Sequence, residues 1–197
     1  MDCYSGKEER FGFFTSLFYT IGTRLPDIRR FYSFVIKDIG AYKTDSMLDV
    51  GTGPGDVPIA LAKLGGISRI CAVDPSYDMV RIARMRSKGL GIEVAQGSSR
   101  HVPFKGRFGI IISTLSFHHW AEKRNALRYL STYLSQNGEI RIYEFDRNSI
   151  KGARRRIASD HSVTEVELKE AAKASGLRLK GVLMKDGFIR ASLTRKR

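Results

Sequence analysis

The segment MLDVGTGPGD, residues 47–56, has the residue types and spacing that point most directly to ligand chemistry. Glycines alternate with other residues at Gly51, Gly53 and Gly55, and an acidic residue follows them. Glycine permits unusual backbone angles and lets a ligand come close to the main chain. A helix that begins at Asp56, with this residue as its N-cap, would direct free N–H groups to the same place. The segment therefore predicts a site for the negatively charged part of a ligand.

Two classes of ligand fit this loop, namely the pyrophosphate of a dinucleotide and the amino-acid carboxylate of S-adenosylmethionine. A dinucleotide fingerprint reads G-x-G-x-x-G, whereas the spacing here is G-x-G-x-G, with Asp49 inside the preceding predicted strand. No lysine of the P-loop type follows, which argues against a nucleoside triphosphate. A tight strand-to-helix turn without a ligand is the structural alternative for the loop alone.

A second acidic residue, Asp74, ends the next predicted strand, residues 68–74. An acidic side chain about 20 residues past such a loop can accept hydrogen bonds from both ribose hydroxyls of an adenosine. The alternative is that Asp74 caps the helix that follows. Because the glycine loop lies upstream, ribose binding is the better interpretation.

Short apolar runs alternate with amphipathic runs along the chain, which predicts a parallel sheet with helices on both faces. The predicted strands are 46–50, 68–74, 91–97, 107–116 and 139–145, and the predicted helices are 56–65, 76–89, 122–138 and 164–176. Residues 177–184 and 188–195 alternate in polarity around Lys185-Asp186-Gly187, which predicts an antiparallel hairpin. We therefore expect an α/β, Rossmann-like, doubly wound fold with a mostly parallel seven-stranded sheet and a C-terminal antiparallel hairpin.

Five stretches, in this order, resemble the class I S-adenosylmethionine-dependent methyltransferases. They are MLDVGTGPGDVPIALAK, ICAVDPSYDMVRIAR, EVAQGSSRHVPF, FGIIISTLSFHHW and GEIRIYEF. The sequence is most similar to the large small-molecule group that includes ubiquinone and menaquinone biosynthesis enzymes. The ordered set of motifs, over roughly residues 45 to 195, is more specific than any one of them. The resemblance implies a methyltransferase domain over 45–197, preceded by an N-terminal helical segment, 1–44, as a candidate lid.

By position, the resemblance implies a cofactor site for S-adenosyl-L-methionine on the loops after four strands. The glycine loop would surround the methionine end and Asp74 would hold the ribose. Ser98 stands where the family usually has an acidic residue near the adenine, so this contact would lose its charge. The implied cofactor residues are Asp49, Gly51, Thr52, Gly53, Gly55, Asp74, Pro75, Gly97, Ser98, Ser99, Ser113 and Thr114.

The stretch STLSFHHW, residues 113–120, follows the fourth predicted strand and should lie beside the acceptor. A sulfonium methyl is already activated, so positioning supplies much of the acceleration, and a base is needed only where the acceptor must lose a proton. His119, or His118 beside it, could act as that base or orient the acceptor. Capping of the next helix is the structural alternative, and no metal pair is expected. Further acceptor-side candidates are Tyr143, Glu144 and Arg147.

The net charge of +14 over 197 residues leaves the class of acceptor open. From residue 151 to residue 197 there are 13 Lys and Arg against 5 Asp and Glu. A small-molecule acceptor is favoured by the resemblance, whereas an RNA or protein acceptor would use the basic surface. A solvated basic face is the structural alternative. Two further alternatives are a NAD-type dinucleotide-binding oxidoreductase and a cofactor-binding protein without catalysis.

The two cysteines, Cys3 and Cys71, form no metal-binding or disulfide pattern, which is typical of a reducing compartment. The aromatic segment 11–22 is too short to span a bilayer and has the wrong flanks for a signal peptide. We therefore expect a cytoplasmic protein with no membrane span. The sequence indicates neither the acceptor atom nor the oligomeric state.

Overall fold

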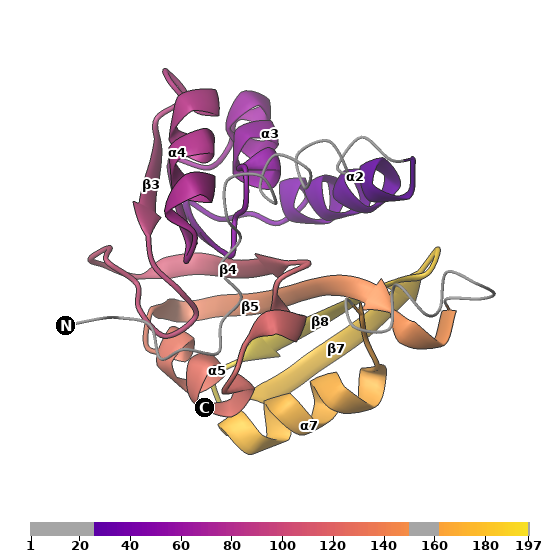
Figure 1. The fold of residues 1–197 in the computed structure, drawn as a ribbon. Coiled ribbons are helices and arrows are strands. Elements are labelled where there is room, and N and C mark those ends of the chain that lie inside the picture. The colour runs from indigo at the N-terminus through magenta and orange to yellow at the C-terminus, as the bar shows by residue number, and fades with distance from the viewer. Residues whose placement is uncertain (1–25, 150–161, 197) are drawn as a thin grey trace.

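Strands and helices alternate along the chain (Figure 1), and the structure, a computed structural model, describes residues 26–149 and 162–196. The strands are β1 (Ser46–Val50), β2 (Arg69–Asp74), β3 (Ile92–Gln96), β4 (Phe108–Thr114), β5 (Leu134–Asp146), β6 (Ser162–Val163), β7 (Arg178–Lys185) and β8 (Phe188–Thr194). The helices are α2 (Pro26–Gly40), α3 (Asp56–Leu64), α4 (Tyr77–Arg86), α5 (Lys123–Ser131) and α7 (Glu165–Ser175), with short 3-10 turns η1 (Phe117–His119) and η2 (Arg147–Ser149).

The strands form one sheet in the order β3-β2-β1-β4-β5-β8-β7, which confirms the predicted fold class. All pairings from β3 to β5 are parallel, and β8 is antiparallel to both of its neighbours. The hairpin turn lies at Asp186 and Gly187, whose φ angles of 54° and 82° suit a tight turn between strands. The two-residue β6 pairs with β5 beyond the seven predicted strands, because so short a strand leaves no periodicity to read.

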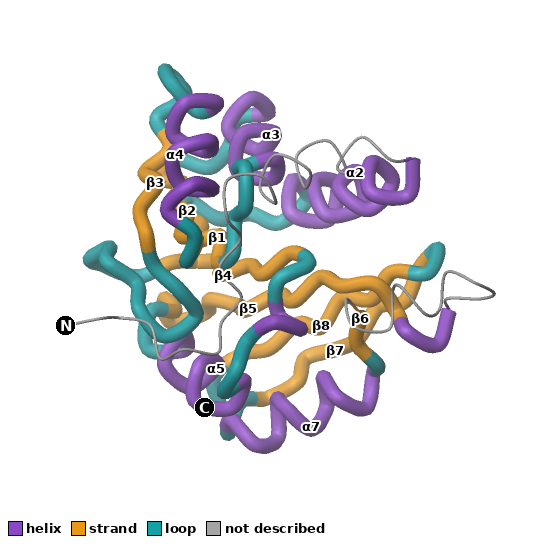
Figure 2. Tube along the Cα trace, in the orientation of Figure 1, coloured by secondary structure: helices purple, strands orange, loops and turns teal. Residues whose placement is uncertain are grey.

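Helices cover both faces of the sheet. Successive side chains of a strand point to opposite faces, so successive residues of the central strands are apolar. Figure 2 shows α2, α3 and α4 on one side, and α5 and α7 on the other. Leu48 and Ile111 pack on the α5 and α7 side, whereas Met47 and Ile110 pack on the α2 and α3 side. This double cover leaves the carboxyl ends of the parallel strands as the place where polar side chains gather.

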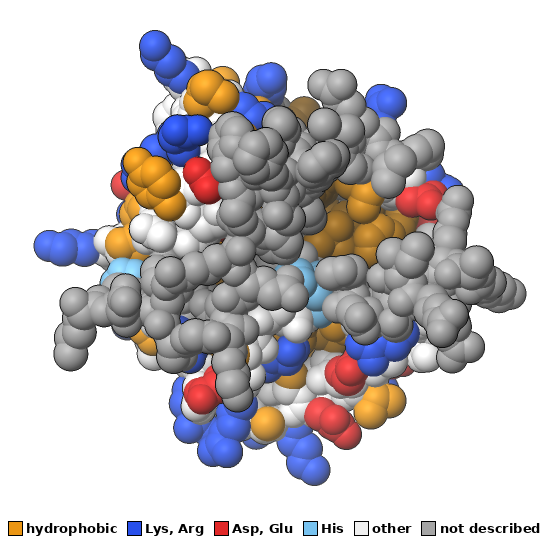
Figure 3. Space-filling view, in the orientation of Figure 1, with side chains coloured by type: hydrophobic (Ala, Val, Ile, Leu, Met, Phe, Trp, Pro, Cys, Tyr) orange, Lys and Arg blue, Asp and Glu red, His pale blue; other side chains and the backbone are white. Residues whose placement is uncertain are grey.

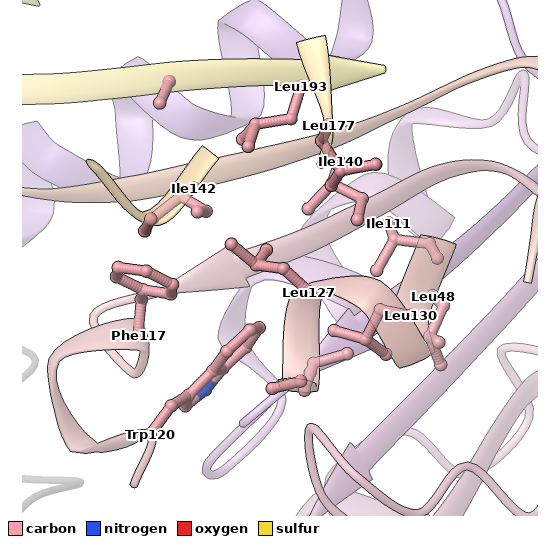
Figure 4. Close-up of a cluster of buried hydrophobic side chains, with 14 of the residues drawn as sticks. Leu48, Ile111, Phe117, Trp120, Leu127, Leu130, Ile140, Ile142, Leu177 and Leu193 are labelled. Atoms are coloured by element: carbon pink, nitrogen blue, oxygen red, sulfur yellow. The ribbon is translucent and has the colours of Figure 1, made fainter. Parts of the chain in front are cut away.

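The core beneath α5 also fixes the loop after β4. Phe117 and Trp120 pack edge to face at 5.1 Å between ring centroids, and both rings are buried. Figure 4 shows them beside Leu127 of α5 and Ile142 of β5. Two aromatic anchors within four residues hold η1 against the core, so the histidines that follow Phe117 have a fixed position.

The predicted helix 122–138 is wrong at its end, because α5 stops at Ser131 and β5 begins at Leu134. The backbone N–H of Phe108 donates to the Tyr133 carbonyl at 2.7 Å, and Phe108 pairs with Leu134 before an irregularity in the ladder. A Cβ at Gly138 would lie 2.9 Å from the Phe108 carbonyl. Strand pairing across this bulge therefore overrides the helical pattern of the sequence.

The predicted N-terminal segment 1–44 is described only in part. α2 lies within it and buries Phe31, Val35 and Ile39, one helical turn apart, against the sheet. Residues 1–25, with the aromatic candidate lid, lie outside the described residues. Within the described ranges, no helix combines the length and apolar character that a membrane crossing requires.

Buried charges join α2 to the middle of the sheet. Arg141 of β5 pairs with Asp38 of α2 at 2.9 Å and with Glu139 at 3.1 Å. The Tyr143 hydroxyl donates to Asp38 at 2.7 Å, and burial, followed by the charge of Asp38, raises the pKa of Tyr143. Lys180 of β7 binds Glu139. Since each charge has a partner, the network fixes how α2 lies on the sheet.

We predict that Asp38→Ala lowers the free energy of unfolding by about 3 kcal/mol, because it leaves Arg141 and Tyr143 buried without their shared acceptor. Urea unfolding followed by circular dichroism measures the change. Asp45→Ala, at an exposed carboxylate before β1, is the matched control and should cost less than about 0.5 kcal/mol. Equal stability of the two variants would contradict the proposed role of the network.

Candidate functional site

The loop after β1 is held against β2 by its backbone. The N–H groups of Gly51 and Thr52 both donate to the Val73 carbonyl, at 2.9 and 3.0 Å. Gly51 has a φ of 79°, and a Cβ there would lie 2.2 Å from the Ser116 hydroxyl oxygen. The first glycine of the loop is therefore required by Ser116, from the loop after β4, whether or not a ligand is bound.

Ser116 connects the two loops and was not predicted from the sequence. Its hydroxyl donates to the Val50 carbonyl at 2.9 Å and accepts from the Trp120 indole N–H at 3.3 Å. Because the single proton of Ser116 is used on Val50, Ser113 must donate in the 3.0 Å bond between the two hydroxyls. The predicted cofactor residue Ser113 is thus part of this loop network.

Gly55, not Asp56, is the N-cap of α3, with φ 83° and no side-chain cap, so the predicted N-cap is wrong. The carboxylate of Asp56 pairs instead with Arg86 of α4 at 2.6 Å, and Arg86 also donates to the Pro54 carbonyl at 2.8 Å. The ion pair with Arg86 on α4 thus keeps the Asp56 side chain from capping the N-terminus of α3. Arg86 thereby holds the glycine loop in place.

Asp74 lies directly beside the glycine loop. Its two carboxylate oxygens accept hydrogen bonds from the backbone N–H groups of Gly53 at 2.8 Å and Ser76 at 2.9 Å. Burial raises the pKa of Asp74 to about 6, although both N–H groups act in the opposite direction. Ser76 is the N-cap of α4, since its hydroxyl accepts from the Met79 N–H. The capping alternative for Asp74 is therefore excluded.

Asp49 is the most buried acid of the loop region, with 1% of its surface exposed. Thr52 donates to one carboxylate oxygen at 2.7 Å, and the other oxygen, Oδ1, has no partner. Burial raises the pKa of Asp49 to about 7. The hydrogen bond from Thr52 lowers this pKa, and the nearby charge of Asp74 raises it further. A small enclosed cavity of about 20 Å³ touches Asp49, Thr114 and Tyr32. Tyr32 of α2 was not predicted, because helical periodicity alone does not show what an aromatic side chain faces.

The residues after β3 form a turn against the same edge. The Gly97 N–H donates to the Asp74 carbonyl at 3.1 Å, and a Cβ on Gly97 would lie 2.6 Å from the His101 carbonyl. Ser98 directs its hydroxyl into its own turn, where it accepts from the Arg100 N–H at 3.2 Å. The buried Ser99 hydroxyl has no partner. Ser99 is therefore the better placed of the two serines to meet a ligand.

The structure thus brings the predicted cofactor residues to the carboxyl ends of β1 to β4. Pro75 contributes its carbonyl, which accepts from the Gln96 side chain at 3.0 Å. Thr114 ends β4 at the same cavity as Asp49 and, like it, has a buried oxygen without a partner. In the described residues there is no cluster of three or more His, Cys, Asp or Glu suited to a metal ion.

The two histidines of η1 differ in their surroundings. The His118 ring nitrogen Nδ1 lies 2.9 Å from Glu144 of β5, and the His118 backbone N–H donates to the same carboxylate at 3.2 Å. The His119 ring packs against it at 3.9 Å between centroids. The Tyr143 hydroxyl points to the opposite face, toward Asp38, so Tyr143 does not lie beside the histidines, and its place on the acceptor side stays a prediction. Successive side chains of β5 point to opposite faces of the sheet, so Tyr143 and Glu144 lie on different faces.

Comparison with known proteins agrees with this arrangement. A family described as methyltransferase domain matches residues 47–138. An uncharacterised methyltransferase of Alkaliphilus oremlandii is 34% identical over 97 residues, 48% of this chain and 43% of that protein. A demethylmenaquinone methyltransferase of Thermotoga maritima is 30% identical over 111 residues, 56% and 48% of the two chains. The alignments span about half the length of these curated relatives.

Solved structures share the whole fold. A putative S-adenosyl-L-methionine-dependent methyltransferase of Methanococcus maripaludis superposes with a TM-score of 0.79 over 98% of each chain, at 18% identity. A SAM-dependent methyltransferase of Aquifex aeolicus gives a TM-score of 0.76 over 93% of this chain and 98% of that one, at 20% identity. Residues 47–138 therefore match the methyltransferase-domain family, and with this strand order and the glycine loop after β1 the chain has the fold of the class I S-adenosylmethionine-dependent methyltransferases.

Proposed function

We propose that this chain binds S-adenosylmethionine at the carboxyl ends of β1 to β4 and transfers its methyl group to a small molecule. The observation that carries the proposal is a set of buried oxygens without partners, on Asp49, Ser99 and Thr114. An unpaired buried polar atom costs about 1–3 kcal/mol, so such atoms are met by water or by a ligand in the native protein. All three belong to the residues that the sequence assigned to the cofactor.

The donor set fits the chemistry of this cofactor. Asp49 offers a carboxylate oxygen to an ammonium group, and the N-terminus of α3 favours a carboxylate. Asp74 would accept from the ribose hydroxyls, with Gly53 and Ser76 keeping its carboxylate in position. The bound cofactor would supply a methyl group on a sulfonium, which leaves the chain to orient the acceptor and exclude water. On this proposal, residues 45–197 form the catalytic domain and 1–44 contribute to covering it.

The class of acceptor is supported by the relatives. The Thermotoga maritima relative is named for demethylmenaquinone, a small molecule. The relatives and solved structures described above are all methyltransferases, so the dinucleotide-binding oxidoreductase alternative has no support. A transfer assay separates an enzyme from a protein that binds the cofactor without catalysis.

Calorimetric titration with S-adenosylmethionine and S-adenosylhomocysteine tests the cofactor site. We expect micromolar binding by the wild type and a loss of roughly 100-fold in Asp74→Ala, because two charge-assisted hydrogen bonds disappear. Asp45→Ala, at an exposed carboxylate away from the loop, should bind as the wild type does. Absence of binding by the wild type, or equal binding by Asp74→Ala, would refute the assignment.

The raised pKa of Asp49 makes cofactor binding depend on pH. Below pH about 7 the buried Asp49 is protonated in the free protein, and an ammonium group beside it requires its ionised form. Affinity should therefore rise up to tenfold per pH unit from pH 5.5 to about 7 and level off above. Calorimetry across this range measures the slope. Asp49→Asn should remove the part of the slope between pH about 6 and about 7, whereas Asp74, whose pKa is about 6, keeps its own contribution below that range. An unchanged slope between pH about 6 and about 7 in Asp49→Asn would assign the proton to another group.

An RNA acceptor is the second candidate, and a basic groove favours it. Arg29, Arg30 and Lys37 of α2 and Lys185 at the end of β7 line a groove of about 800 Å³. Asp38 and Asp186 line the same groove, and Asp38 is already paired with Arg141. On the face drawn in Figure 3, by contrast, Lys and Arg side chains lie scattered around the periphery. Phosphate groups are the anions that such a groove suits.

The RNA alternative requires that the chain bind a structured RNA fragment with an affinity that depends on salt. Because several phosphate contacts would be made, this affinity should fall by roughly several powers of ten between about 50 and 500 mM salt. Fluorescence anisotropy with a labelled tRNA measures this slope. The variant Arg29→Ala/Arg30→Ala should weaken binding and flatten the slope, whereas Arg128→Ala on α5 should not. Weak binding that is insensitive to salt would eliminate this candidate and leave the small molecule.

A further inference from the structure

A second and much larger cavity lies at the carboxyl ends of β4 and β5, beyond the glycine loop. Its volume is about 790 Å³, within the usual size for small-molecule sites. Residues of η1, α5, η2, β6 and α7 line it, and part of its wall is apolar, namely Phe117, Val163, Ala171 and Ala174. Figure 3 shows histidine side chains at the surface near the centre of this face of the molecule. The cavity can therefore hold a small, partly apolar compound beside η1.

His118 lines this cavity and is oriented by Glu144. The Glu144 side chain is 0% exposed and bonds both the ring and the backbone N–H of His118, which fixes the residue at two points. A carboxylate only accepts, so the proton of the neutral ring lies on Nδ1. Nε2 is then the proton-accepting nitrogen of His118. A buried carboxylate that sets the tautomer of a histidine is the arrangement of a general base.

Lys123 of α5 keeps the backbone of η1 in place. Its ammonium donates to the carbonyls of His118 at 3.2 Å and Trp120 at 3.0 Å, and burial lowers its pKa. Arg147 of η2 is paired with Glu167 of α7 at 2.9 Å. Among the described residues, the charged side chains that line the cavity or bond to His118 are Lys123, Arg124, Glu144, Arg147, Glu167 and Glu170. Of these, Glu144 bonds to the His118 ring.

We propose that His118 is the base that accepts a proton from a hydroxyl-bearing acceptor bound in this cavity, and that Glu144 is its positioning residue. The inference rests on the proposed methyltransferase function. The acceptor oxygen forms a bond to the methyl carbon, the carbon–sulfur bond breaks with its electron pair on sulfur, and the hydroxyl proton passes to Nε2 of His118. The substrate class is a small aromatic compound with an ionisable hydroxyl. His119, the first candidate from the sequence, packs its ring against that of His118 and serves as the comparison.

The test uses the full chain with labelled S-adenosylmethionine and a series of phenols of graded acidity, from phenol and 4-hydroxybenzoate to 4-nitrophenol. The wild type should methylate members of this series. His118→Asn should lower kcat at least 100-fold on phenol and much less on 4-nitrophenol, which needs no base, while S-adenosylhomocysteine binds unchanged. His119→Asn, the matched control, should stay within about fivefold of the wild type.

Glu144→Gln tests the positioning role. In Glu144→Gln we expect kcat to fall roughly 10- to 100-fold with little change in KM, and the lower limb of the pH profile to shift. Glu144→Asp should restore part of the rate. Long-range ¹⁵N correlation spectra of the wild-type protein should show the His118 ring with its proton on Nδ1, a readout that needs no variant to fold.

Three results would overturn the proposal: the opposite tautomer of His118, equal loss of rate in His118→Asn and His119→Asn, or normal S-adenosylhomocysteine binding with no methylation of any phenol. Failure of the wild type to bind S-adenosylhomocysteine would instead refute the proposed function itself, and the two failures are therefore distinguishable.

Discussion

The contact between Gly51 and Ser116 couples the two loops on which both candidate sites are built. A residue with a side chain cannot occupy position 51 while the Ser116 hydroxyl reaches the Val50 carbonyl, because the Cβ would lie 2.2 Å from that oxygen. Ser116 also accepts from Trp120, which anchors η1 in the core. The glycine loop and the histidines of η1 are therefore placed by one shared set of hydrogen bonds.

The position of α2 depends on a different interaction, the paired charges around Arg141. Apolar contacts of Phe31, Val35 and Ile39 would allow α2 to slide or rotate on the sheet, since hydrophobic packing has little direction. The Asp38 carboxylate, shared by Arg141 and Tyr143, removes that freedom. As a result Tyr32 lies over the small cavity beside Asp49. Directional polar contacts at one end of α2 thus determine what its other turns cover.

Local patterns predicted the fold well, and long-range contacts account for what they missed. Alternation of strands and helices, the glycine spacing and the Asp186-Gly187 turn each depend on neighbours in sequence, and the strand order and hairpin are confirmed. Ser116 could not be predicted, because its partner Val50 is 66 residues away. The same holds for the start of β5, which depends on pairing with Phe108, and for the capture of Asp56 by Arg86. The assigned roles of the cofactor residues and histidines stay predictions.

The bulge at the start of β5 has a consequence for how this chain tolerates insertions and deletions. Beyond it, odd-numbered residues such as Arg141 and Tyr143 face α2, whereas Ile142 and Glu144 face α5 and η1. Losing a single residue within the strand after the bulge would exchange these faces, and would place a carboxylate in the aromatic layer and a tyrosine beside His118. Length changes in this strand are therefore confined to the bulge itself, where an unpaired residue can be absorbed without reversing the alternation.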